Sequence, residues 1–199
     1  MYIGGNLTVG NLSNSYNPNY YDKIKIDGPI YVNGDLIIKG ADAKLNTLIY
    51  VNGNVTIENS RINGLNVNNK EGSLIIFANG EVKISNNSVN LDEPSRIKGY
   101  FYSNEVFEMY GVGSNIRIEG GISAQQIVLN AIRGRASNNY FVNSQRVKSK
   151  YYEERENQAD KPSRLQVIYN PEIINTYSNL KQQEPVIYNV DPPKEIKRE

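Results

Sequence analysis

The side chains that could do chemistry in this chain are carboxylates, Lys, Arg, Tyr and hydroxyls, because the sequence contains no His and no Cys. This composition excludes thiol nucleophiles, disulfides, Ser-His-Asp triads and Cys or His metal sites. The best candidate pair of carboxylates is Glu81 and Glu105, one column apart in a repeat described below. Glycoside hydrolysis uses two carboxylates about 5–10 Å apart, which stacked strands could supply. A solvated corner pair explains these residues equally well, so we predict no enzyme, no catalytic residue, no cofactor and no metal site.

The charges of the chain are nearly balanced, with 22 Lys and Arg, 21 Asp and Glu, and a net charge of +1. Nucleic acids and anionic membranes both require a concentrated basic face, so we predict no nucleic-acid partner and no membrane contact. No stretch approaches the roughly 18 apolar residues of a membrane span, and the first residues do not form a signal peptide. Either the protein is cytosolic or its export segment has been removed.

An internal repeat accounts for part of the high asparagine content, 29 residues in 199. Its clearest copies are residues 30–38 (IYVNGDLII), 49–57 (IYVNGNVTI) and 76–84 (IFANGEVKI). Weaker copies occupy residues 4–9, 101–109 and 121–129, so that the aligned positions are 29, 19, 27, 25 and 20 residues apart. Each copy is two short alternating strands joined at Asn-Gly and rich in Ile, Val and Tyr, which favour strands.

Two architectures fit this repeat. Asn-Gly is a strong signal for a tight hairpin, which would give a row of antiparallel hairpins. The apolar positions, however, keep the same phase on both sides of Asn-Gly in every strong copy, as stacked coils require. We therefore predict an all-β fold, a right-handed parallel β-helix (solenoid) of about six coils, with a C-terminal cap that contains a short α-helix.

Stacked coils would align like residues in columns. One predicted column is a structural corner ladder, in which Asn tolerates positive φ and its amides bond from coil to coil: Asn33, Asn52, Asn79 and Asn104. A second column points outward and forms an aromatic stripe: Tyr31, Tyr50, Phe77, Tyr102 and, in the last copy, Ile122. The stripe is either an interaction surface for carbohydrate or a partner, or a product of stacking between coils and burial under the C-terminal tail. Lys83 aligns with Glu108, which predicts an ion pair between coils.

The pattern changes after residue 136, so we divide the chain into a β-solenoid, residues 1–136, and a C-terminal cap or tail, residues 137–199. Residues 148–161 are dense in charge and predict a short exposed helix or a mobile linker. Asn170 and Pro171 then predict the start of a helix that continues to about Gln183. Because the last coil of a solenoid exposes unpaired strand edges, we expect residues 137–199 to cover that end or to lie along one face.

Three segments resemble the C-terminal part of PilX-type pilus-assembly proteins of Firmicutes: residues 99–104 (GYFYSN), 110–122 (YGVGSNIRIEGGI) and 127–134 (IVLNAIRG). In that family a prepilin-like apolar helix precedes coils of this kind. The resemblance implies an extracellular or cell-surface, pilus-associated role without enzymatic activity. The chain lacks the apolar helix and opens inside a repeat, so we expect it to be a fragment that has lost its N-terminal membrane segment.

Three functions therefore remain open from the sequence. The first is a non-catalytic structural or interaction module of an exported pilus-associated or cell-surface protein, whose partners are other surface or pilus proteins or a polysaccharide. The second is a bactofilin-like scaffold that forms polymers, which irregular repeat lengths and a helical tail disfavour. The third is a β-helix protein that binds or cleaves polysaccharides, which the aromatic stripe and the Glu81/Glu105 pair favour.

Overall fold

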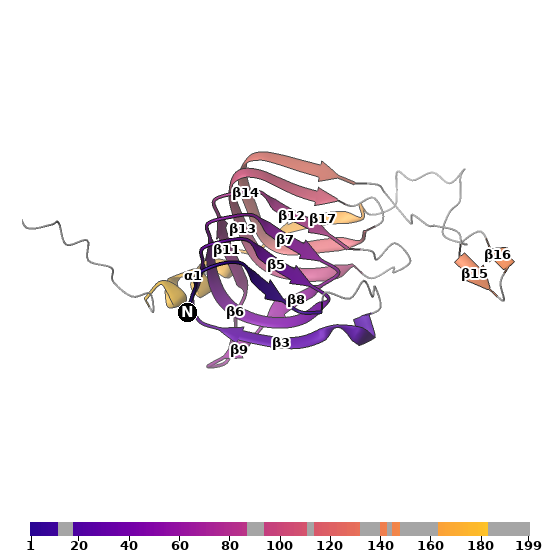
Figure 1. Cartoon of the computed structure of the whole chain (residues 1–199). Helices are drawn as coiled ribbons and strands as arrows, with labels where there is room; N and C mark the ends of the chain where they lie inside the picture. Colours follow the sequence, from indigo (N-terminus) through magenta and orange to yellow (C-terminus); the bar gives the residue numbers. More distant parts are fainter. Residues whose placement is uncertain are drawn as a thin grey trace, which may run out of the picture.

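The fold is mostly β, with one 3-10 helix, η1 (Pro18–Tyr20), and one short α-helix, α1 (Ile173–Lys181) (Figure 1). It is seen in a computed structural model, which describes residues 1–11, 18–86, 94–110, 114–131, 140–142, 145–147 and 163–182. The strands up to residue 71 are β1 (Tyr2–Ile3), β2 (Leu7–Val9), β3 (Asp22–Asp27), β4 (Ile30–Val32), β5 (Leu36–Lys39), β6 (Ala41–Val51), β7 (Val55–Glu58), β8 (Arg61–Gly64), β9 (Asn66–Val67) and β10 (Lys70–Glu71). The later strands are β11 (Leu74–Ala78), β12 (Val82–Ser85), β13 (Ser95–Tyr110), β14 (Ile116–Asn130), β15 (Tyr140–Val142), β16 (Gln145–Val147) and β17 (Leu165–Tyr169).

The strands of the main sheet pair in parallel and form three ladders. The first ladder aligns one residue from each of β1, β4, β6, β11, β13 and β14: Tyr2, Tyr31, Tyr50, Phe77, Tyr102 and Ser123. The second ladder aligns residues of β2, β5, β7, β12, β13 and β14: Leu7, Leu36, Val55, Val82, Phe107 and Ile127. The third ladder aligns residues of β3, β6, β8, β13, β14 and β17: Ile24, Ala43, Ile62, Ile97, Ile118 and Val167.

The long strands connect the ladders to one another. β6, β13 and β14 each bend and continue from the third ladder into the first, and β13 and β14 go on into the second. As a result β6, β11, β13 and β8 pair in a closed ring. Gly120 lies at the bend of β14 with φ 152°, where a Cβ would meet the carbonyl oxygen of Gly99. Glycine is therefore needed at this bend.

The hairpin alternative is wrong for the Asn-Gly sites. β4 and β5 flank the first of them, yet β4 pairs with β1 and β6, whereas β5 pairs with β2 and β7. A tight antiparallel hairpin does occur between β9 and β10, over residues 66–71. Its two turn residues, Asn68 and Asn69, have φ of 50° and 60°, the left-handed conformation that such turns require.

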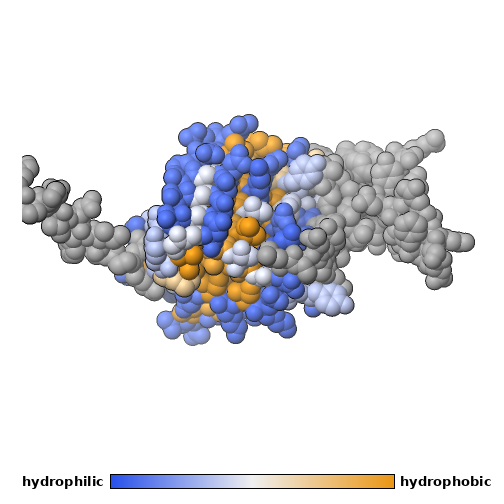
Figure 2. All heavy atoms as spheres, in the orientation of Figure 1, coloured by the Kyte–Doolittle hydropathy of each residue, from blue (hydrophilic) through white to orange (hydrophobic). Residues whose placement is uncertain are grey.

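The core fills the space that the ladders enclose. It consists of the apolar residues that alternate inward along the strands, nearly all of them Ile, Val and Leu. Phe101 and Phe107 are the largest fully buried side chains, and their ring centroids lie 6.0 Å apart. Figure 2 shows the outer side of this arrangement, where residues of like hydropathy form rows that run across the strands.

The tail contributes two described elements to the main body. β17 extends the third ladder by pairing with β14, and α1 packs against the outer side of the first ladder (Figure 1). The predicted helix is confirmed, but it begins at Ile173 rather than at Pro171. Asn170 is not the residue before the helix: its side chain accepts a hydrogen bond from the Glu172 N–H at 3.0 Å and closes a turn ahead of it. The charged residues 148–161 lie outside the described part of the chain, as do residues 183–199.

Candidate functional site

The asparagine column (Asn33, Asn52, Asn79 and Asn104) lies at the corner between the first and second ladders. The Asn52 amide donates to Oδ1 of Asn33 at 3.3 Å, and the Asn79 amide donates to Oδ1 of Asn52 at 3.3 Å. The Asn104 amide continues the chain to Asn79 at 2.8 Å, and the Tyr102 hydroxyl donates to Asn104 at 2.9 Å. The structure thus brings together all four residues predicted for this column, and their amides bond from strand to strand.

A second polar column, one that sequence reasoning missed, runs beside the first. The Oδ1 atoms of Asn6, Asp35 and Asn54 each accept the backbone N–H of the residue at the same position in the next repeat, at 2.8–2.9 Å. These acceptors occupy the space in which a Cβ of the motif glycine would lie, as at Gly53. Asn52 and Gly53 do not have positive φ, so the predicted reason for Asn-Gly is wrong here. Glycine is required because a neighbouring side chain approaches too closely.

The aromatic stripe (Tyr31, Tyr50, Phe77 and Tyr102) is aligned in register on the outer side of the first ladder, and Tyr2 extends it. The ring centroids of Tyr2 and Tyr31 lie 5.4 Å apart, and those of Tyr50 and Phe77 lie 5.5 Å apart. The Phe77 and Tyr102 centroids are 5.8 Å apart. The prediction that Ile122 belongs to the stripe is wrong by one residue, because Ser123 pairs with Tyr102 and Ile122 pairs with the buried Phe101. The last copy of the repeat lacks Asn-Gly, so its sequence does not fix its alignment with the earlier copies. The residue predicted for the stripe is therefore shifted by one position.

Helix α1 covers the middle of the stripe and leaves its ends exposed. Tyr177 meets Phe77 edge-on with centroids 6.0 Å apart, and Lys181 lies over the Tyr50 ring at 5.9 Å. Tyr31 and Tyr102, in contrast, are 40% and 36% exposed. Helix α1 thus partly covers the central rings, Tyr50 and Phe77, and leaves Tyr31 and Tyr102 exposed. An interaction role for the exposed rings stays a prediction.

A shallow hollow of about 220 Å³ lies between the aromatic stripe and the asparagine column. Its floor and sides are the rings of Tyr31, Tyr50, Phe77 and Tyr102 and the amides of the adjacent asparagines. Aromatic faces and amide groups together can bind a sugar ring or a partner side chain.

Two further hollows flank α1. The larger, about 580 Å³, lies between the helix and the β9–β10 hairpin, and we name it the amide groove because Asn46, Asn68, Asn69, Asn175 and Asn179 line it. The smaller, about 330 Å³, is mostly aromatic and apolar and includes Tyr100, Tyr169 and Ile174. The helix thus creates concave surface that the sheet alone would not offer.

The candidate carboxylates are engaged in other interactions. Glu81 forms an ion pair with Lys83 at 2.7 Å, which raises the pKa of Lys83, chiefly through the hydrogen bond to Glu81. Lys83 and Glu108 are paired in register, as predicted, but the ion pair of Lys83 is with Glu81. Val82 pairs with Phe107, so Glu105 lies one column away from Glu81 on the neighbouring strand, as predicted.

A charged network on the outer side of the third ladder was not found from the sequence. Glu119 accepts from Nε and Nη2 of Arg96 at 2.8 and 2.6 Å, and Lys98 donates to Glu71 at 2.7 Å. The hydrogen bond from Lys98 lowers the pKa of Glu71, and the hydrogen bond to Glu119 raises the pKa of Arg96. Lys98 is only 2% exposed, because the β9–β10 hairpin folds over it. No motif in the sequence links these residues, since the hairpin that joins them is an insertion between repeats.

Within the described residues, no helix is long and apolar enough to cross a membrane. The same residues contain no group of three or more Asp or Glu placed to hold a metal ion. In comparisons with known proteins, no protein-family model, no curated protein and no solved structure matches the chain.

Proposed function

We propose that the chain is a right-handed parallel β-helix of six coils that acts as a non-catalytic structural and interaction module. In this proposal it belongs to an exported cell-surface or pilus-associated protein, as the resemblance to PilX-type proteins implies. Its role is that of a rigid spacer whose outer surface contacts other surface proteins.

The observation that carries the proposal is the asparagine column. Three amide hydrogen bonds join four successive repeats, with Asn52 and Asn79 each donating one bond and accepting another. Such a ladder adds stability along the stacking direction and has no role in proton transfer. Side chains with ionisable groups are used in the same way: Lys39 pairs with Glu58 at 3.0 Å, across neighbouring strands. Polar residues thus serve to hold strands together, which suits a scaffold.

The interaction role rests on the ends of the aromatic stripe. Tyr31 and Tyr102 expose large rings beside the hollow, and exposed aromatic residues are typical centres of protein interfaces. Because the middle of the stripe is covered by α1, a partner would contact one end or displace the helix. Tyr31 and Tyr102 are therefore the residues whose truncation should weaken a partner complex.

Localisation tests the proposal directly. Cells that express the protein from its native gene should lose the antigen when intact cells are treated with protease, and sheared pili should carry it. An antigen that resists protease until the cells are lysed would contradict the proposed location. Tyr31→Ala/Tyr102→Ala should reduce the amount recovered with the surface fraction, whereas Tyr110→Ala, an exposed tyrosine in the second ladder, should not.

The non-catalytic part needs a separate test. Purified protein incubated with a panel of polysaccharides should release no reducing ends. Release that is lost in Glu81→Gln would contradict the proposal and revive the hypothesis of a polysaccharide-cleaving protein.

A second candidate function, an end-to-end polymer, is favoured by the last strand of the second ladder. Ile127 and Leu129 are 44% and 48% exposed, although the residues paired with them, Phe107 and Met109, are fully buried. Helix α1 packs beside the first ladder, so its presence does not argue against end-to-end stacking. Concentration-dependent growth in light scattering, abolished by Ile127→Asp/Leu129→Asp, would establish the polymer; a monomer at all concentrations would exclude it.

A further inference from the structure

The outer face of the third ladder gathers positive charge that is scattered in the sequence. Its register places Lys23 beside Asp42 and Asp42 beside Arg61, while Lys25 lies beside Lys44. Neighbouring strands continue the face with Arg96 paired with Arg117. The face and the hairpin over it hold eight cationic side chains against four carboxylates: Lys23, Lys25, Lys44, Arg61, Lys70, Arg96, Lys98 and Arg117 against Asp27, Asp42, Glu71 and Glu119. This surplus of four positive charges exceeds the net charge of the whole chain, +1.

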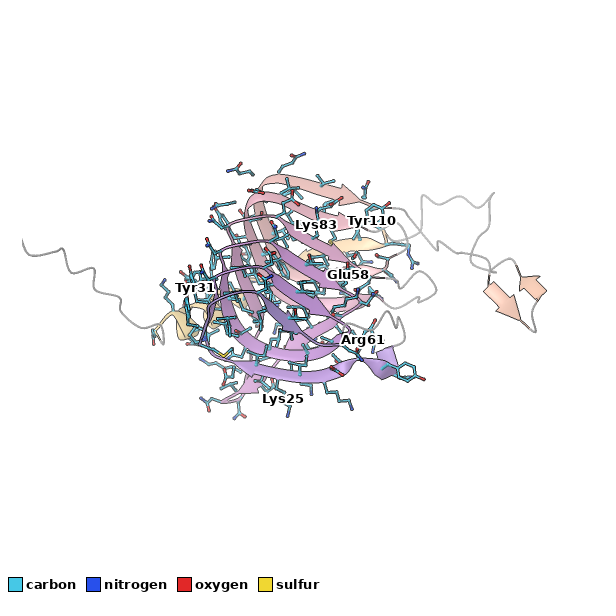
Figure 3. All side chains as sticks on the ribbon, viewed as in Figure 1. Lys25, Tyr31, Glu58, Arg61, Lys83 and Tyr110 are labelled. Atoms are coloured by element: carbon cyan, nitrogen blue, oxygen red, sulfur yellow. The ribbon has the colours of Figure 1, made fainter. Side chains whose placement is uncertain are left out.

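The two halves of the face differ in whether their cations form ion pairs. In the half formed by β13 and β14, Arg96 and Lys98 are paired with Glu119 and Glu71 in the charged network. In the half formed by β3, β6 and β8, the cations are exposed, and no carboxylate of the described residues forms an ion pair with them. We name these four cations the basic patch: Lys23, Lys25, Lys44 and Arg61. In Figure 3 Lys25 points away from the sheet at the lower edge of the molecule.

Within the basic patch, Asp42 lies in register between Lys23 and Arg61, whereas Lys25 and Lys44 have no carboxylate paired with them. Lys25 and Lys44 are directly paired on neighbouring strands, which lie about 4.8 Å apart, and like charges in that arrangement destabilise a sheet. Asp27, two residues after Lys25, already accepts a hydrogen bond from the Asn46 amide at 2.7 Å. An external anion would relieve the repulsion between Lys25 and Lys44.

The amide groove continues the same face. Asn46 follows Lys44 on the outer side of β6, and its side chain lines the groove together with Asn68 and Asn69 of the hairpin. Side-chain amides donate to and accept from hydroxyl groups, whereas exposed Lys and Arg attract anions. The two features together match a ligand that carries both many hydroxyls and regularly spaced negative charges.

We propose that the basic patch and the amide groove bind a linear acidic polysaccharide that carries carboxylate groups. The polysaccharide runs across the strands, with carboxylates against Lys25, Lys44 and Arg61 and sugar hydroxyls against the groove. The distance between successive strands, about 4.8 Å, is close to the length of one sugar ring in an extended chain, so carboxylates on neighbouring sugars can face Lys25 and Lys44 on their neighbouring strands. Duplex DNA is the less suitable polyanion, because a hydroxyl-binding groove adds nothing to contacts with its phosphates.

Binding of purified protein to polygalacturonate and hyaluronate, measured by calorimetry at about 50 and 200 mM salt, tests the proposal. We expect binding to at least one of them that weakens as salt rises, and no binding to neutral dextran. Lys25→Gln/Lys44→Gln should lower the affinity about tenfold or more, whereas Lys25→Arg/Lys44→Arg should stay within about threefold of the original protein. The matched control is Lys39→Gln/Lys83→Gln, which removes the same charge from the second ladder and should change the affinity less than about twofold.

Four outcomes would overturn the proposal: no binding to either acidic polysaccharide, equal binding to dextran, equal loss in the two Gln double variants, or tighter binding to duplex DNA. Far-UV circular dichroism of each variant separates loss of binding from loss of fold. The proposal is independent of location and pilus association, so the cell-surface experiment can fail while this one succeeds.

Discussion

The asparagine column and the basic patch are built by the same stacking of parallel strands, but stacking has opposite consequences for them. An amide carries both donors and an acceptor, so identical asparagines satisfy one another, as Asn52 does with Asn33 and Asn79. An ammonium carries donors only, so Lys25 and Lys44 repel each other when their strands pair. Repeated amides on paired parallel strands therefore stabilise the sheet, whereas repeated cations form a surface that can bind an anion.

The largest effect should come from the glycine of the corner. In Gly53→Ala the new Cβ would meet Oδ1 of Asp35 and approach the carbonyl of Gly34 to 2.9 Å. Since backbone cannot move aside without breaking the ladder, we expect a loss of about 2–4 kcal/mol in the free energy of unfolding. Urea denaturation followed by circular dichroism measures it. The control is Gly5→Ala, the equivalent position in the first repeat, where nothing lies within 4 Å and the change should stay below about 0.5 kcal/mol. Equal stability of the two variants would mean that close approach does not explain the motif.

The next effect should come from the charged network, where the face does provide a counter-charge. Glu71→Ala leaves Lys98, 2% exposed, without its partner, so we expect a loss of about 1–2 kcal/mol. The loss stays below that of a fully buried pair because the Glu71 side chain is 42% exposed. Glu71→Ala/Lys98→Met should recover most of the stability, because no unpaired charge remains. Failure of the double variant to recover would show that the hairpin, rather than the pair, had been damaged.

The pH dependence of the same network has a defined sign. The pKa of Glu71 is held below its usual 4.5, chiefly by the hydrogen bond from Lys98. A lowered pKa contributes stability that is fully present above the ordinary value and is lost as the pH falls through the folded value. The difference in stability between the original protein and Glu71→Gln should therefore be constant from pH 7 to pH 5 and shrink below about pH 4. A difference that grows on acidification would contradict this assignment.

A smaller effect should come from the asparagine column itself. Asn52→Ala removes one donated and one accepted hydrogen bond in the ladder, whereas Asn33→Ala removes one accepted bond. Because the column is exposed, we expect losses of about 1 kcal/mol for Asn52→Ala and about half as much for Asn33→Ala. Thermal unfolding compared between the two variants measures the ratio. Equal losses would mean that the hydrogen bonds of the column do not determine the stability of these variants.

The sequence predicted the structure best where residues of the same type align on neighbouring strands. The spacing of apolar residues around Asn-Gly predicted parallel strands, the asparagine column and most of the aromatic stripe. It misplaced Ile122 because the last repeat has no Asn-Gly to fix its alignment. It also assigned Asn-Gly to positive φ, whereas glycine is needed at Gly53 to leave room for Asp35. That requirement depends on the neighbouring repeat, so no local propensity could reveal it.

The basic patch was not predicted from the sequence, for a different reason. Composition gives only the net charge, +1, in which the cations of one face are cancelled by acids elsewhere. Lys23 and Arg61 are far apart in the chain and are joined only by the register of β3, β6 and β8. That register depends on the third strand of each repeat, which has no Asn-Gly motif. The covering of the stripe by α1 was likewise inaccessible, because a helical pattern predicts a helix and not the face on which it packs.

The smallest effect should come from reversing the charge of one residue of the basic patch. In Lys44→Glu the new carboxylate would lie beside Lys25 on the neighbouring strand, so an opposite-charge pair replaces two like charges. We expect a gain of about 0.3–1 kcal/mol in the free energy of unfolding, because cross-strand pairs of opposite charge contribute in that range. Lys83→Glu in the second ladder provides the matched control with the opposite sign, since it would place a third carboxylate beside Glu81 and Glu108. Both changes should shrink in about 1 M salt, where the Debye length falls to about 3 Å. If Lys44→Glu destabilises the protein even at low salt, the cations of the patch do not repel one another, and the contrast with the asparagine column fails.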